Sequence, residues 1–111
     1  MHLDDLLHTL LDADSRLAWT DDVDDPALAA SYADTLDAAR RRTGRHESVL
    51  ACEGTIRGRR VAVIAGDPQF LGGSIGVAAG EILTRAVERA TDERLPLIAL
   101  PVGGGTRMQE G

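Results

Sequence analysis

The sequence predicts an α/β fold in which two N-terminal helices precede a β-β-α-β unit. Three observations predict it. Apolar residues repeat at helical spacing in much of residues 1–46, but from Glu47 onward short runs rich in β-branched residues take over. A long amphipathic stretch then separates two of these runs, as a helix that connects strands of one sheet would. We therefore predict a helical arm at residues 1–46 and the first part of a layered α/β domain at residues 47–111.

The first helix is predicted at the N-terminus, where leucines form one stripe and Asp and His residues take the other side. The leucines fall at i, i+3, i+4, i+7 and i+8, and they are Leu3, Leu6, Leu7, Leu10 and Leu11. A stripe of this kind needs an apolar surface to cover. We interpret it as a cover for this chain's own core, and docking on another subunit is the alternative.

The second helix is predicted over residues 26–43. Asp25 suits the N-cap and Pro26 suits the first helical position. Gly44 follows three arginines, residues 40–42, and this order is typical of a helix C-terminus whose carbonyl dipoles attract positive charge. We interpret the arginines as that helix end, with a role facing a phosphate-bearing ligand as the alternative.

Two β-rich runs, residues 48–56 and 59–65, predict a hairpin with Arg57-Gly58 at its turn. Cys52 lies inside the first run. No His-based activating group lies near this lone cysteine in the sequence, so we predict a buried structural thiol rather than a nucleophile.

The last part of the chain contains two glycine clusters, each placed after a strand. Residues 66–73 form a loop that leads into a long helix, predicted from Ser74 to Glu93. A third strand at residues 97–100 ends in three glycines, residues 103–105. The chain then stops where a new helix is expected to begin, which indicates a chain cut short. The long helix presents a broad apolar face made of Ile75, Ala79, Ile82, Leu83, Ala86, Val87 and Ala90.

Composition excludes several classes of function. The net charge is −6, and all twelve basic residues are arginines, so the chain is a poor match for a binder of nucleic acid or of a membrane surface. The acidic start is unlike a secretory leader, and no apolar run approaches the roughly 20 residues of a membrane span. We therefore predict a cytoplasmic protein. An acidic run after Trp19 is predicted to be a solvated linker, and it comprises Asp21, Asp22, Asp24 and Asp25.

Glycines between a strand and a helix N-terminus suit an oxyanion or a phosphate, because they leave backbone N–H groups unobstructed. Both clusters have that placement. The run Gly72-Gly73-Ser74-Ile75-Gly76 lacks the Lys of a P-loop and the spacing of a dinucleotide fingerprint, so nucleotide binding is disfavoured. Close packing of a helix on a sheet is the structural alternative for the first cluster.

Metal and triad chemistry find no support in the sequence. The histidines have no paired spacing with one another or with the cysteine, and no serine lies in a G-x-S-x-G elbow. We predict no metal, and any catalysis would rely on backbone polarisation or on a base outside this chain. The histidines are His2, His8 and His46, and the serines are Ser48 and Ser74.

Four segments together resemble the β-type carboxyltransferase domain of acetyl-CoA and acyl-CoA carboxylases, in the order and spacing of that family. They run from Tyr32-Ala33-Asp34-Thr35-Leu36 to Arg42-Thr43-Gly44, then Glu53-Gly54-Thr55-Ile56-Arg57-Gly58, Phe70-Leu71-Gly72-Gly73-Ser74-Ile75-Gly76 and Gly104-Gly105-Thr106-Arg107-Met108-Gln109-Glu110-Gly111. The resemblance covers roughly the whole chain. No Cys-x-x-Cys pair occurs, so the chain resembles the members without a zinc ribbon.

The resemblance implies a partial crotonase-like fold, a spiral of β-β-α units. It also implies an enzyme activity, the transfer of a carboxyl group from carboxybiotin to the α-carbon of an acyl-CoA such as acetyl-CoA or propionyl-CoA. Biotin would arrive on a biotin carboxyl carrier protein that works with a biotin carboxylase, with no metal and no cofactor bound covalently to this chain. Because family members are roughly twice as long, the resemblance implies a second carboxyltransferase half or α subunit in an oligomer, and an inactive chain without it.

The resemblance assigns roles to residues of both glycine clusters. Gly104, Gly105 and Thr106 match the loop whose backbone N–H groups hold the enolate oxyanion, although the family more often has Ala at the last position. Gly72 and Gly73, followed by Ser74, match the loop beside the CoA pocket. Two alternatives remain open: a malonate decarboxylase β subunit on the same scaffold, and a non-catalytic fragment that docks on a complete subunit through its leucine stripe.

Overall fold

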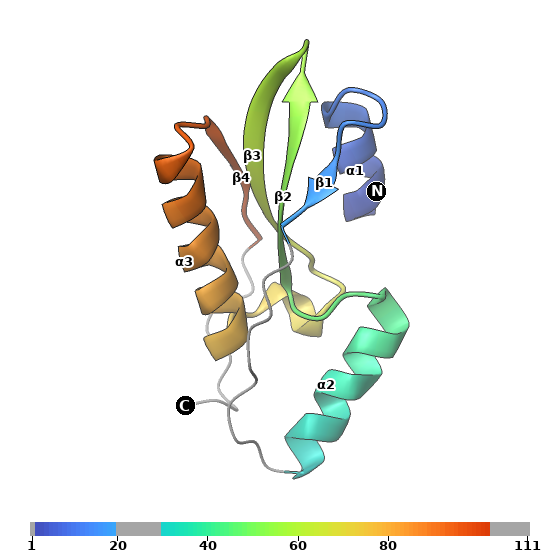
Figure 1. Cartoon of the computed structure of the whole chain (residues 1–111). Coiled ribbons are helices and arrows are strands. Elements are labelled where there is room, and N and C mark those ends of the chain that lie inside the picture. Colours follow the sequence, from blue (N-terminus) through green and yellow to red (C-terminus); the bar gives the residue numbers. More distant parts are fainter. Residues whose placement is uncertain (1, 20–29, 103–111) are drawn as a thin grey trace.

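The computed structural model describes residues 2–19 and 30–102, which form an α/β fold with a four-stranded sheet (Figure 1). In chain order the elements are α1 (Leu3–Leu10), β1 (Leu17–Ala18), α2 (Ala30–Thr43), β2 (Val49–Ile56), β3 (Arg59–Gly66), the short 3₁₀ helix η1 (Leu71–Gly73), α3 (Val77–Asp92) and β4 (Leu97–Leu100). The predicted β-β-α-β order from residue 47 is confirmed.

The sheet has the order β1-β2-β3-β4. β1 and β2 are antiparallel, β2 and β3 form the predicted antiparallel hairpin, and β4 runs parallel to β3. At the hairpin turn Arg57 has φ +52° and Gly58 has φ +79°, two consecutive left-handed residues as in a type I′ turn. β1, which pairs with β2 through Leu17 and Ala18 only, was not predicted from the sequence.

Helices α1 and α3 lie on opposite sides of the sheet (Figure 1). On the α1 side, Leu7 and Leu11 are buried against Cys52 of β2 and two valines of β3. Leu11 also rests on Gly54, where a Cβ atom would come within 2.7 Å of the leucine Cδ1. The leucine stripe therefore covers this chain's own core, as the preferred interpretation expected, although Leu6 remains 39% exposed.

On the α3 side the contact is made by small residues. Ala86 and Ala90 of α3 are buried against Ala51 of β2 and Ala62 of β3, and Trp19 completes this cluster. The predicted apolar face is wrong in part, because Ile75 is 39% exposed and Val87 is 44% exposed. Alanines bring the helix close to the sheet, so bulky residues flank the contact instead of forming it.

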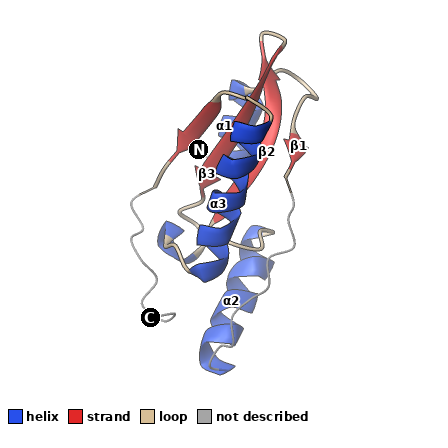
Figure 2. Ribbon diagram, turned by 60° about the vertical axis from the view of Figure 1, so that its left-hand side comes forward, coloured by secondary structure: helices blue, strands red, loops and turns tan. Residues whose placement is uncertain are grey.

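Helix α2 lies beyond one end of the sheet (Figure 2) and buries Tyr32, Leu36 and Ala39 with Phe70. Its predicted end is confirmed: it finishes at Thr43, and Gly44 follows with φ +71°. The predicted N-cap, the first helical position and the acidic linker fall outside the described residues.

Helix α3 begins at Val77, three residues later than predicted. Gly72 and Gly73 have φ of +67° and +79°, and Ser74 and Gly76 have extended backbone, so the chain adopts the 3₁₀ turn and a short extended link before the helix. The expected start at Ser74 is therefore wrong. The loop continues to Gly76, although the helical spacing of apolar residues predicts a helix from Ser74.

Asp12 links the loop after α1 to the tip of the β2–β3 hairpin by hydrogen bonds. Its carboxylate accepts hydrogen bonds from Thr55 Oγ1 at 2.7 Å, from the Arg57 N–H at 3.0 Å and from the Gly58 N–H at 2.8 Å. The Asp12 N–H in turn donates to the Thr55 carbonyl at 2.7 Å. The Thr55 hydrogen bond, with those from Gly58 and Arg57, lowers the pKa of Asp12.

Candidate functional site

The candidate site lies where the carboxyl ends of β3 and β4 meet the start of α3. β3 ends at Gly66, β4 leads into Pro101 and Val102, and the loop of residues 67–76 returns the chain from β3 to α3. Because β3 and β4 are parallel, both strands deliver their following loops to the same edge of the sheet. In open α/β sheets, ligands bind at this kind of edge.

Two glycines of this region are required by the close approach of Val102. A Cβ atom at Gly73 would lie 2.4 Å from Val102 Cγ2, and one at Gly66 would lie 2.6 Å from the same methyl group. Gly73 also has φ +79°, which favours glycine on its own. The structural alternative from the sequence, close packing of a helix on the sheet, does not describe Gly73, because its near neighbours are Val102 at the strand exit and Pro68 of the loop.

The same contact brings the two predicted glycine segments together as far as the described chain extends. Val102, which precedes the second cluster, packs on Gly73 of the first. Gly104, Gly105 and Thr106 themselves lie outside the described residues. The sequence analysis missed Val102, although an aliphatic residue directly before a glycine cluster at a strand end is a signal that it could have used.

A cavity of about 120 Å³ opens at this junction. None of the described residues that line it has an ionisable side chain. These residues are Val49, Ile64, Ala65, Gly66, Gly73, Ile75, Leu83, Ala99, Leu100, Pro101 and Val102. A pocket with this lining suits an apolar or thioester group and offers no general base of its own.

Residues 72–74 are held in place by the chain's own hydrogen bonds. The Gly73 N–H donates to the Phe70 carbonyl at 2.9 Å, and the Ser74 N–H donates to the Leu71 carbonyl at 3.2 Å. The Ser48 hydroxyl, directly before β2, donates to the Ser74 carbonyl at 2.6 Å. The N–H groups of Gly73 and Ser74 therefore shape the turn, and Gly72 is the exposed residue of the three that are predicted to lie beside the CoA.

The N-terminus of α3 follows directly after this loop. Gly76 is the N-cap, and the first turn of α3 carries no acidic residue. The positive end of the helix dipole is thus not neutralised by side chains of its own first turn, which favours a negatively charged group nearby.

Cys52 is buried as predicted, with 1% of its surface exposed. Burial raises the pKa of its thiol, and a nearby arginine, Arg16, opposes this only in part. A thiol in this state is a weak nucleophile. Since it packs under α1, on the opposite face from α3, we assign it to the core.

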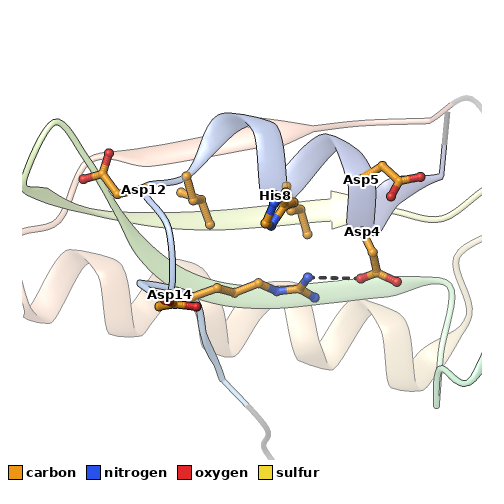
Figure 3. Close-up of a pocket in the computed structure, with 8 residues that line it drawn as sticks. Asp4, Asp5, His8, Asp12 and Asp14 are labelled. Atoms are coloured by element: carbon orange, nitrogen blue, oxygen red, sulfur yellow. Dashed lines mark hydrogen bonds and ion pairs between the residues drawn. The ribbon is translucent and has the colours of Figure 1, made fainter.

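A larger hollow of about 340 Å³ lies between α1 and the loop that follows it, and Figure 3 shows the acidic groups around it. Asp4 is paired with Arg16 at 3.0 Å, marked by the dashed line, and Asp12 is committed to the hairpin tip. Among residues 2–19 and 30–102 no group of three or more His, Cys, Asp or Glu residues could hold a metal ion. Among these residues, the hollow therefore does not provide a metal site.

No helix within residues 2–19 and 30–102 is both long enough and apolar enough to span a bilayer.

Residues 19–111 match the carboxyl transferase domain family. The chain is 57% identical, over 97% of its length, to the probable biotin-dependent acyl-coenzyme A carboxylase beta3 subunit of Mycobacterium tuberculosis, of which it covers 22%. It is 41% identical, over 94% of its length, to the acetyl-coenzyme A carboxylase carboxyl transferase subunits beta/alpha of Salinispora arenicola, of which it covers 21%. The chain thus spans about a fifth of the length of these relatives.

The fold matches a solved structure of transcarboxylase 12S with a TM-score of 0.81 at 24% identity, over all of this chain and 20% of that one. A likeness at this identity shows a common fold. Because the match covers all of this chain, it includes the parallel β3–β4 pair and the helix α3 between these strands. On the family match, supported by this fold, the chain belongs to the carboxyl transferase domain family.

Proposed function

We propose that this chain is part of the carboxyltransferase component of a biotin-dependent acyl-CoA carboxylase, with a β-β-α spiral of the crotonase type. The observation that carries the proposal is the family match over residues 19–111, which includes both glycine clusters. The relatives named above are acyl-CoA and acetyl-CoA carboxylase subunits. The substrate would be a short acyl-CoA, acetyl-CoA or propionyl-CoA.

In this proposal the thioester lies at the carboxyl ends of β3 and β4. Loss of the α-proton leaves an enolate, and backbone N–H groups of Gly104, Gly105 and Thr106 would stabilise its oxygen. Gly72, Gly73 and Ser74 would border the CoA. The positive end of α3 and the absence of acidic residues in its first turn support the binding of an anion here.

The described lining of the cavity contains no ionisable side chain, which fits a base supplied by the second substrate. Carboxybiotin would supply the carboxyl group and, once its N–C bond breaks, the nitrogen that takes the α-proton. The new C–C bond forms at the α-carbon. The protein's own part is to orient the thioester, to stabilise the enolate and to keep water from it.

The partners follow from the same proposal. They are a biotin carboxyl carrier protein, a biotin carboxylase, and further carboxyltransferase sequence, fused or in an α subunit, within an oligomer. Transcarboxylase 12S, the protein of the matching fold, is described as a hexamer with methylmalonyl-coenzyme A bound.

The proposal is tested by titrating propionyl-CoA and acetyl-CoA against the chain by calorimetry. We expect binding that Gly73→Val abolishes, because the new side chain would collide with Val102. Gly58→Ala is the matched control: it also replaces a glycine with positive φ, but at the hairpin tip with nothing within 4 Å of its Cβ position. Equal affinity of the wild type and Gly73→Val would contradict the site, and the absence of CoA binding by the chain joined to the rest of its carboxyltransferase would contradict the function.

A second assay separates the proposed enzyme from a malonate decarboxylase. The chain supplied with its carboxylase partners should form methylmalonyl-CoA from propionyl-CoA and carboxybiotin. Release of CO₂ from a malonyl thioester on a carrier protein, without transfer from carboxybiotin, would favour the decarboxylase instead.

A further inference from the structure

The glycine loop is linked to Asp67 by a continuous series of hydrogen bonds. One oxygen of the buried Asp67 carboxylate accepts the Gln69 N–H at 2.9 Å, and the Asp67 carbonyl accepts the Phe70 N–H at 3.1 Å. The Phe70 carbonyl then accepts the Gly73 N–H at 2.9 Å. The conformation of Gly73 therefore depends, through two backbone steps, on where Asp67 is held.

Asp67 is held by Arg45, which comes from the helical arm. Arg45 Nε lies 2.6 Å from the second carboxylate oxygen of Asp67, and its terminal NH2 group lies 2.9 Å from Asp4 in the first turn of α1. The Arg45 N–H donates to Thr43 Oγ1 at 3.1 Å, which fixes the arginine to the end of α2. One guanidinium thus joins α1, α2 and the loop that leads to Gly72 and Gly73.

This bridge is more buried than an ordinary surface pair, so the loss of one partner has a larger consequence. The side chains of Arg45 and Asp67 are 14% and 8% exposed, whereas Asp4 is 61% exposed. Burial works against the charge on Arg45, but hydrogen bonds to Asp67 and Asp4 outweigh it and raise the pKa of its guanidinium. Removal of one partner from a buried pair leaves the other charge uncompensated, so the loop would have to rearrange.

The arm contacts the same loop at a second place. The Arg42 NH2 group donates to the Gln69 carbonyl at 2.9 Å, and the Gln69 side-chain amide lies 2.8 Å from His2 Nδ1. Three residues of the arm therefore reach residues 67–69, within a few residues of the exposed Gly72. Of the three, Arg45 alone reaches a buried carboxylate, so it has the largest effect on the loop.

We propose that Arg45 is a positioning residue for the glycine loop: through Asp67 it holds residues 71–74 in the conformation that binds the acyl-CoA. The ligand in this inference rests on the proposed function, whereas the order of the loop does not. The inference also gives the helical arm a part in the site at the sheet edge, beyond its cover of the core.

The experiment compares Arg45→Gln with Asp4→Asn, which weakens the exposed branch of the bridge together with the pair between Asp4 and Arg16. Arg85→Gln, on the exposed face of α3, is the matched control. Amide hydrogen exchange is followed by NMR at Gly73 and Ser74, and at Cys52 and Val63 as core references. We expect exchange at Gly73 to quicken about tenfold or more in Arg45→Gln, with a smaller change in Asp4→Asn and none in Arg85→Gln. The core amides should keep their protection.

Affinity for propionyl-CoA provides the second measurement. It should fall about tenfold in Arg45→Gln and recover in part in Arg45→Lys, whose single ammonium can keep Asp67 but not both carboxylates. If Arg45→Gln does not fold, Arg45→Lys and Asp67→Asn test the same exchange prediction. Unchanged exchange at Gly73, or a loss of protection equal at Gly73 and in the core, would overturn the proposal. Absence of CoA binding by the wild-type chain joined to the rest of its carboxyltransferase would contradict the proposed function, while the exchange result would still decide the role of Arg45.

Discussion

The two faces of the sheet are closed in opposite ways. On the α1 face, leucine side chains fill the space over Cys52, Gly54 and the valines of β3. On the α3 face, alanines of the helix contact alanines of the strands. A charged layer adjoins this contact, and it comprises Glu53, Arg60, Arg89 and Glu93. Packing on the α1 face depends on the volume of the leucine side chains, whereas packing on the α3 face depends on small side chains that let the helix approach the sheet closely. Opposite kinds of substitution should therefore disrupt them.

Leu7→Ala should have the largest effect, because Leu7 is fully buried at the centre of the α1 face. Loss of a buried leucine leaves a cavity and costs about 2–5 kcal/mol. Urea unfolding measures this as a lower midpoint with an unchanged slope. Leu6→Ala, on the same helix but 39% exposed, should cost much less, and equal losses for the two variants would show that the face does not depend on volume.

Ala86→Leu should come next, through the opposite cause. Ala86 is 3% exposed between α3 and the sheet, so three added carbons would push the helix away at a cost of about 1–3 kcal/mol. The control is Val87→Leu, the neighbouring position with 44% exposure. Should both variants unfold at the same urea concentration, the close packing of α3 would be refuted.

Glu53→Gln should have a smaller effect, at the charged layer of the α3 face. Glu53 accepts a hydrogen bond from Trp19 Nε1 at 3.3 Å and pairs with Arg60 at 2.9 Å, while Arg89 lies over the Trp19 ring at 4.3 Å. We expect a loss of about 1 kcal/mol or less, because Arg60 is half exposed. Trp19 fluorescence should change in the folded state, and an unaltered spectrum would argue against the contact.

The smallest effect should be a dependence on acid. Hydrogen bonds from Arg60, only partly opposed by burial, lower the pKa of Glu53 below its usual value of 4.5. The folded state then binds fewer protons than the unfolded state, so this stabilisation is present above pH 4.5 and is lost as the pH falls through the lowered pKa. At pH values below 4.5, the urea midpoint of the wild type should decrease more steeply with falling pH than that of Glu53→Gln. Glu88→Gln, on the exposed side of α3, should follow the wild type.

Much of the fold could be predicted because its signals are local. The leucine stripe, the turn at Arg57-Gly58, the stop at Gly44 and the run at residues 97–100 each express a periodicity or a backbone preference that acts within a few residues. The parts that were missed depend on tertiary contacts. β1 has only two paired residues, and the start of α3 depends on the two left-handed glycines of the preceding loop.

The apolar face of α3 was misjudged for a related reason. Hydrophobicity favoured Ile75 and Val87, but close packing selects small side chains, and Ala78, which was not predicted, is 2% exposed. At the candidate site, the glycines of the first cluster were predicted from their placement in the sequence, and their role stays a prediction. Val102 and Asp67 were not found, since their importance comes from which segments they meet in space.

The contact between Asp12 and the hairpin tip has a consequence for how the chain folds. Arg57 occupies the left-handed region, which costs a residue with a side chain about 1–2 kcal/mol. The hydrogen bonds that offset this cost come from a carboxylate more than forty residues earlier in the chain. The turn is thus favoured locally at Gly58 but strained at Arg57, and the hairpin should be a poor folding nucleus by itself. We expect the hairpin tip to become ordered only when the segment that carries Asp12 docks on it. The N-terminal segment and the hairpin tip should therefore gain structure in one cooperative step.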